Sequence, residues 1–150
     1  MGDISKDINS KFTNDKVKVL INILYTANWI TSFQNEFFKP FGISPQQYNI
    51  LRILNGANKA LKVQTIKGRM VERSPNATRL MDKLCEKHLI ERIPCPEDRR
   101  VVHIEITEKG KQLLNEISNN FNAELVKNIT QQEAQQLSDL LDKMRFTKEL

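Results

Sequence analysis

The chain has 150 residues, of which 39% are hydrophobic and 27% are charged, and its formal net charge is +5. This composition is typical of a globular protein and excludes a disordered chain, and the length favours one domain. No apolar run approaches the roughly 18–20 residues of a membrane span, and the first residues lack the pattern of a secretory signal. Two cysteines do not make a disulfide scaffold. We therefore expect a cytoplasmic protein with no membrane partner.

The positive charge is concentrated in the middle of the chain. Residues 62–100 carry 10 basic and 6 acidic side chains, whereas residues 101–150 carry 6 basic and 8 acidic ones. A basic excess confined to one segment indicates a surface for an anionic partner. A solvated basic face without a partner has the same composition, so both readings stay open at this point.

Helical spacing predicts a long first helix from about Asn14 to Phe38. Its apolar side chains occupy more than one face, so the helix is either central to the fold or meets another chain. Pro40 and Gly42 end it.

Two shorter helices follow. The first helix is expected to start with a capping box at residues 44–47, in which Ser44 is the cap. Asn55–Gly56 is expected to end this helix. The second is predicted from about Val63 to Met70.

The next predicted helix runs from Ser74, as its cap, to about Lys87. One stripe of it is apolar, and the remaining surface is polar or charged. An asparagine can pair with adenine and an arginine with guanine, and free N–H groups at a helix start suit a phosphate. The candidate DNA-reading residues on this helix are Ser74, Asn76, Thr78, Arg79 and Lys83.

The spacing then changes to the alternation of strands. Residues 89–93 and 101–106 are predicted to form a β-hairpin, and residues 94–100 its exposed tip, with two prolines and four charges. Arg99 and Arg100 suit a DNA minor groove, where negative potential attracts guanidinium groups. Asp98 is expected to orient one of these arginines through a charge-assisted hydrogen bond.

The C-terminal part is predicted to be helical again. Thr107 caps a helix from Glu108 to about Asn128, and residues 130–133 form a second capping box before a last, leucine-striped helix.

The order of the predicted elements indicates a winged helix-turn-helix: a helix, a short helix, a polar-faced helix and a basic hairpin. In such a module the polar-faced helix, the second of the helix-turn-helix, enters the major groove of DNA. Two runs, residues 74–84 (SPNATRLMDKL) and 88–92 (HLIER), resemble the MarR family of bacterial transcriptional regulators. Two further matches are residues 97–100 (EDRR) and 106–110 (ITEKG).

The resemblance implies a mainly α fold with a small β-hairpin wing, in which residues 1–42 and 107–150 are dimerisation helices and residues 43–106 bind DNA. It also implies a homodimer on a pseudo-palindromic double-stranded DNA operator, usually acting as a repressor. Asp98 and Arg100 correspond to the family's wing pair, which leaves Arg99 as a phosphate contact. His88 stands where the family usually has a glycine.

Members of the family bind small phenolic ligands near the junction of the two regions. Tyr25, Trp29, Phe33 and Tyr48 are candidates to line such a pocket for a small aromatic effector. Aromatic residues at helical spacing are, however, more often ordinary core.

Other kinds of function have less support. The main alternative is a winged-helix module that binds protein and has lost DNA binding. The sequence shows no nucleophile–base pair, phosphate-binding glycine loop or metal-ligand cluster, so we expect neither an enzyme nor a cofactor. Cys85 fits a small, semi-buried core residue, and Cys95 in the wing is either an incidental thiol or a redox switch.

Overall fold

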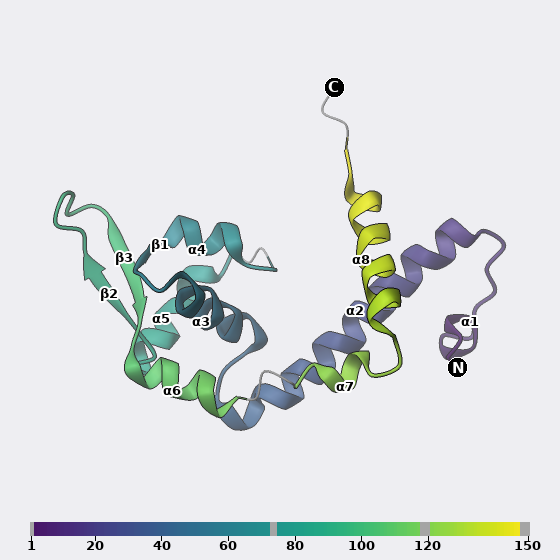
Figure 1. The fold of residues 1–150 in the computed structure, drawn as a ribbon, viewed down its shortest axis with the longest axis horizontal. Coiled ribbons are helices and arrows are strands. Elements are labelled where there is room, and N and C mark those ends of the chain that lie inside the picture. Colours follow the sequence, from purple (N-terminus) through teal and green to yellow (C-terminus); the bar gives the residue numbers. More distant parts are fainter. Residues whose placement is uncertain (1, 73–74, 118–120, 148–150) are drawn as a thin grey trace. The chain divides into compact units, whose positions relative to one another are not determined.

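The computed structural model describes residues 2–72, 75–117 and 121–147, which fall into two compact units, Met1–Glu116 and Ile117–Leu150. The first unit begins with α1 (Ile4–Asp7), α2 (Asp15–Phe38), the short 3-10 helix η1 (Lys39–Phe41) and α3 (Pro45–Ala57) (Figure 1). It continues with β1 (Leu61–Lys62), α4 (Val63–Arg69), α5 (Ala77–Glu86), β2 (Ile90–Pro94), β3 (Val102–Ile106) and α6 (Glu108–Glu116). The second unit holds α7 (Ala123–Val126) and α8 (Gln131–Arg145).

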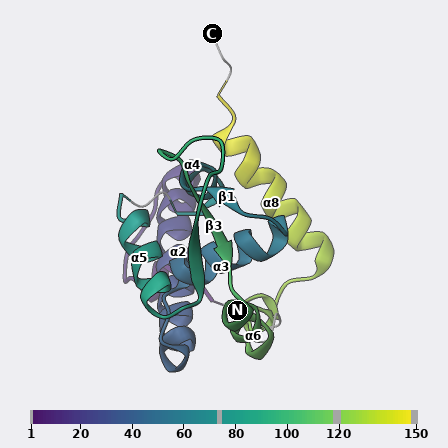
Figure 2. The ribbon, with the colours of Figure 1, turned by 90° about the vertical axis from the view of Figure 1, so that its left-hand side faces the viewer.

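The strands of the first unit form one antiparallel sheet in the order β1-β3-β2. The predicted hairpin is confirmed, with Ile90 opposite Ile106 and Pro94 opposite Val102. It projects from the unit on the left of Figure 1, and Figure 2, viewed from that side, shows α5 at one margin. The mainly α fold with a small β wing is therefore confirmed. The third strand, β1, was not predicted, because two residues are too few to show alternation.

Helix α3 lies at the centre of the first unit. It contacts α2, α4, α5, β3 and α6. Its side chains Ile50, Leu51 and Leu54 are almost completely buried, as are Ile66 of α4 and Ile104 of β3. Each such side chain contributes about 1.5–3 kcal/mol of burial free energy. The core of the unit is therefore built around α3.

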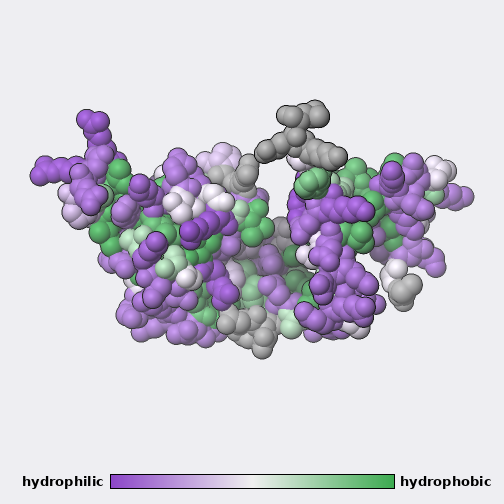
Figure 3. Space-filling view, turned by 45° about the horizontal axis from the view of Figure 1, so that its top comes forward, coloured by the Kyte–Doolittle hydropathy of each residue, from purple (hydrophilic) through white to green (hydrophobic). Residues whose placement is uncertain are grey.

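Helix α2 buries little despite its 24 residues. Phe38, the last of them, is its one buried residue. Several of its large apolar side chains are about half exposed, among them Leu20 at 46%, Leu24 at 56% and Trp29 at 50%. Hydrophobic residues, green in Figure 3, reach the surface among hydrophilic ones. Within the first unit, α2 therefore adds only its last residue to the buried core.

Three predicted helix starts are confirmed by their caps. Asn14 accepts a hydrogen bond from the backbone N–H of Lys16 at 2.8 Å. Ser44 with Gln47, and Thr130 with Glu133, form complete capping boxes. These interactions join residues at most three positions apart, so they can be recognised in the sequence.

Two predicted boundaries are wrong. Helix α3 continues through Gly56 and ends at Ala57, because the left-handed turn falls on Asn58, with φ +53°. Helix α5 begins at Ala77 rather than after Ser74, since Asn76 occupies the cap position with no capping hydrogen bond from its side chain. Its end at Glu86, with Lys87 as the C-cap, agrees with the predicted end at about Lys87. Ser74 itself lies outside the described residues.

The single helix predicted from Glu108 to Asn128 is also wrong. The structure has α6 up to Glu116 and α7 from Ala123, with a turn at residues 121 and 122. Asparagine is a poor helix former because its side chain competes for backbone hydrogen bonds, and Asn122 lies in this turn. Helical periodicity in the apolar residues on either side concealed the interruption.

The end of α5 is joined tightly to the start of α6. His88 follows α5 with φ +60°, in the left-handed region, and its carbonyl accepts the Thr107 hydroxyl at 2.7 Å. The backbone N–H of Thr107 donates to the Leu89 carbonyl at 3.1 Å. A Cβ atom at Gly110 would overlap the Leu89 carbonyl oxygen and lie 2.7 Å from Cγ1 of Ile106, so α6 can approach only through a glycine.

Candidate nucleic-acid interface

Helix α5 is held in place by one apolar face. Ala77, Met81 and Leu84 are buried, at the spacing of a single helix stripe. The buried side chain of Gln47, on α3, donates from Nε2 to the Leu80 carbonyl at 3.3 Å. Apolar packing and this hydrogen bond fix how α5 rests on α3, and thereby which face it presents to solvent.

The opposite face of α5 carries the predicted reading residues. Thr78, Arg79 and Lys83 are exposed, and the last two lie four residues apart, on one side of the helix. Asn76, just before the helix, is also exposed. The structure thus brings four of the five predicted residues together, and the fifth, Ser74, lies outside the described part.

The tip of the hairpin exposes Arg99 and Arg100. Asp98 stabilises the turn beneath them, because its Oδ1 accepts the backbone N–H of Arg100 at 3.0 Å and its carbonyl accepts that of Val101 at 3.1 Å. The sequence predicted that Asp98 would hold an arginine side chain. The structure corrects this: the carboxylate bonds to the backbone, and no ion pair joins it to either guanidinium group.

An ion pair that the sequence did not predict joins α5 to the wing. Asp82 of α5 and Arg92 of β2 form a hydrogen-bonded salt bridge, with both side chains about half exposed. Near it, burial raises the pKa of the Cys85 thiol, with Arg92 acting in the opposite direction and Asp82 raising it further. Cys85 is half-buried, as predicted, and so is Cys95 in the wing.

The four aromatic residues predicted to line a ligand pocket do not share one environment. Tyr25 and Trp29 are 43% and 50% exposed, and Phe33 is half-buried. Tyr48 is half-buried, with its ring 4.6 Å from that of Phe38, a core residue. The role of these four residues in a ligand pocket therefore stays a prediction.

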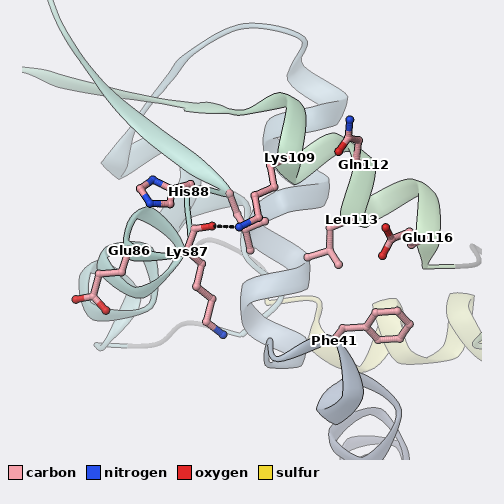
Figure 4. A pocket seen from close by; sticks show the side chains of 9 residues that line it. Phe41, Glu86, Lys87, His88, Lys109, Gln112, Leu113 and Glu116 are labelled. Carbon is pink, nitrogen blue, oxygen red and sulfur yellow. Dashed lines mark hydrogen bonds between the residues drawn. The ribbon is translucent and has the colours of Figure 1, made fainter.

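A cavity of about 420 Å³ lies elsewhere in the first unit, and none of these four residues lines it. Phe41 of η1 and Leu113 of α6 contribute apolar walls, and Lys87 and Lys109 contribute ammonium groups (Figure 4). Three segments far apart in the sequence form it, so no local pattern could have indicated it.

The described residues hold neither a cluster of metal ligands nor a membrane-spanning helix. No three His, Cys, Asp or Glu side chains within these ranges converge as ligands of a metal ion would. None of the described helices is long and apolar enough to cross a membrane.

Comparisons with known proteins identify the family. Residues 43–102, which run from just before α3 to the start of β3, match the model of the MarR family. The HTH-type transcriptional regulator MhqR of Bacillus subtilis is 27% identical over 135 residues, which cover 88% of this chain and 92% of the relative. Residues 43–102 therefore carry a MarR-family domain.

Solved structures extend the MarR fold over most of the chain. A mutant MarR from E. coli, solved in complex with operator DNA, is 25% identical, with a TM-score of 0.78, over 91% of this chain and 100% of that one. An organohalide-sensing regulator, solved in its 2,4-dichlorophenol-bound form, shares the fold at 21% identity, with a TM-score of 0.78, over 88% of this chain and 80% of that one.

The matching MarR domain and these relatives support a transcriptional regulator with a winged-helix fold. Proteins of this family regulate transcription and are not enzymes.

Proposed function

We propose that this protein is a homodimeric repressor that binds a pseudo-palindromic operator in double-stranded DNA, and that a small aromatic ligand releases it. The carrying observation is the single polar and basic surface formed by the exposed face of α5 and the exposed arginines of the wing. A location in the cytoplasm of a bacterium accompanies this function.

The two elements suit two grooves of DNA. The major groove is about 12 Å wide and admits a helix, so Asn76, Thr78 and Arg79 of the α5 region would face base edges. Lys83 and Arg99 would contact phosphates, and Arg100 would enter the adjacent minor groove. The Asp82–Arg92 ion pair supports a fixed geometry between helix and wing. The E. coli relative was solved with operator DNA, which supports the same use of the fold here.

The apolar surface of the helices outside the DNA-reading part supports a homodimer. Leu20, Leu24 and Trp29 of α2 are about half exposed, as is Leu137 of α8, and Leu140 of α8 is 63% exposed. Soluble monomers rarely expose so many large apolar side chains on their helices, whereas an interface between two copies would bury them. Two-fold symmetry would then place the two α5 helices about one DNA turn apart, roughly 34 Å.

The effector is proposed from the exposed aromatic residues of α2 and from the regulator solved with 2,4-dichlorophenol. Tyr25, Trp29 and Phe33 offer the apolar, aromatic contacts that a phenol would use, with Tyr48 as a fourth candidate.

The DNA part is tested by selecting bound sequences from random DNA and measuring affinity for the selected site by fluorescence anisotropy. We expect Arg100→Ala to weaken binding at least tenfold, and Lys83→Ala to reduce the salt dependence by about one counterion. Arg145→Ala, an exposed arginine of α8, is the matched control and should bind normally. Unchanged affinity in Arg100→Ala would remove the wing from the interface. Binding of no DNA at all would favour a protein-binding module.

The dimer is tested by analytical ultracentrifugation. We expect a species of twice the 17.4 kDa chain mass. Leu24→Glu should shift the protein toward monomer because it would bury a charge, and Gln64→Glu, at an exposed polar position of α4 outside the proposed interface, should not. A monomeric wild-type protein would contradict the proposal.

A further inference from the structure

The segment between α4 and α5 exposes one large apolar side chain. Val71 follows Met70, the cap residue of α4, and is 91% exposed, whereas Met70 is buried. No other large apolar side chain of the described residues is exposed to this degree. Single exposed apolar residues are common on protein surfaces, so exposure alone does not indicate a function. What distinguishes Val71 is how its backbone is held and where it stands in the chain.

Two side chains of α3 hold this segment. Oδ1 of Asn49 accepts the backbone N–H of Val71 at 3.0 Å. Nε2 of Gln46 donates to Oε2 of Glu72 at 2.7 Å. Gln46 and Asn49 are three positions apart, on one side of the helix around which the core of the first unit is built. The backbone of Val71 is therefore fixed to the centre of the unit although its side chain projects into solvent.

The side chain of Val71 suits an apolar partner. It carries no hydrogen-bond donor or acceptor. Its branched Cβ restricts the χ1 rotamers, so little conformational entropy is lost when a partner covers it. A stiff side chain on a fixed backbone is prepared for a contact with a small apolar group.

The position of Val71 in the chain indicates which group that is. Val71 precedes Asn76 by five residues, and five residues span at most about 18 Å. Since successive base pairs are about 3.4 Å apart, Val71 lies within about five base pairs of the bases that Asn76 faces in the proposed function. The base edges in the major groove are polar except for the C5 methyl group of thymine.

We propose that Val71 is a specificity-determining residue that contacts the C5 methyl group of a thymine in the operator. Asn49 is the positioning residue that holds Val71 for this contact. The contact rests on the proposed function, and it adds a base preference that comes from neither α5 nor the wing.

Selection from random DNA locates the thymine. Sites selected with the wild-type protein should contain a thymine within about five base pairs of the position whose base preference changes in Asn76→Ala. Sites selected with Val71→Ala should lose the preference for that thymine and keep the others. Because Val71 is 91% exposed, this variant removes no core contact. An unchanged preference at every thymine in Val71→Ala would overturn the contact.

Deoxyuridine then tests the methyl group itself, because it differs from thymidine only by lacking that group. Placed at the located thymine of one half-site, it should weaken wild-type binding about fourfold in fluorescence anisotropy, as expected for one buried methyl group. In Val71→Ala this methyl effect should fall below about twofold. Deoxyuridine at a thymine outside the expected range is the control on the DNA. Arg100→Ala is the control on the protein, since it should bind more weakly but keep the fourfold effect.

Two variants of Asn49 test the positioning role. Asn49→Ala removes the acceptor of the Val71 N–H and should reduce the methyl effect below about twofold, whereas Asn49→Asp keeps Oδ1 and should retain it. A merely structural role would lower the affinity for both DNAs equally and leave their ratio unchanged. That result in Asn49→Ala, or loss of the methyl effect in Asn49→Asp as well, would overturn the positioning role.

Failure of this contact and failure of the proposed function give different results. Wild-type protein that binds its selected site equally well with thymine or deoxyuridine at every position would overturn the contact and leave the proposed function standing. A methyl effect that persists in full in Val71→Ala would assign the methyl group to another residue and would also overturn it. Failure to bind any DNA would overturn the proposed function and the contact together.

Discussion

Replacing Gly110 with alanine tests how closely α6 packs on the end of α5. The new Cβ would lie 2.7 Å from Cγ1 of Ile106, about 0.7 Å inside ordinary contact at 3.4 Å, and would also overlap the Leu89 carbonyl oxygen. Overpacking of this kind costs about 1–3 kcal/mol, and a backbone carbonyl yields less readily than a side chain. The better helix propensity of alanine, about 1 kcal/mol, offsets only part of this cost. We expect a net loss of about 2 kcal/mol.

Urea denaturation followed by circular dichroism measures this loss. With an m-value of about 1–3 kcal/mol per molar, the midpoint for Gly110→Ala should fall by about 1 M. Gly68→Ala is the matched control, because a Cβ atom at Gly68 meets nothing within 4 Å and the helix should gain about 0.5–1 kcal/mol. A Gly110→Ala protein as stable as the wild type would refute the tight approach of α6 to Leu89.

Three further predictions concern stability. His88→Gly should raise the melting temperature, since relief of about 1–2 kcal/mol of left-handed strain exceeds the roughly 0.5–1 kcal/mol entropic cost of glycine; a lower melting temperature would contradict this. Ser44→Ala should cost about 1 kcal/mol in urea denaturation because the capping box of α3 is lost, and an unchanged midpoint would argue against that box. Asp82→Ala should cost less than about 1 kcal/mol, because Asp82 and Arg92 are about half exposed; a loss above 2 kcal/mol would show a stronger ion pair.

The features of the fold that could be predicted are those that neighbouring residues produce. The capping boxes at Ser44 and Thr130 close between residues three positions apart. The alternating residues of the wing pair within one hairpin. Apolar residues at helical spacing located α2, α3 and α8. Each of these interactions is nearly independent of the rest of the chain, so the sequence shows it directly.

The sequence was sufficient to predict which candidate DNA-binding residues are exposed. It was not sufficient to predict the hydrogen bonds that hold them in place. Thr78, Arg79, Lys83, Arg99 and Arg100 are exposed where the sequence placed them. The role expected for Asp98 was wrong in detail, because a short aspartate in a tight turn reaches the backbone N–H two residues on more readily than a flexible guanidinium group.

The remaining features, which are the ion pair, the third strand and the cavity, depend on contacts between elements that are far apart in the sequence. The ion pair between Asp82 and Arg92 exists because β2 packs beside α5, and the third strand exists because Leu61 meets Ile104 across the sheet. The cavity exists because η1, the end of α5 and α6 converge around Lys87. Local sequence patterns do not show these contacts, because they depend on how side chains distant in sequence pack together. Residue type and spacing were sufficient to predict a winged-helix DNA reader. How the elements of that winged helix are held together follows from packing.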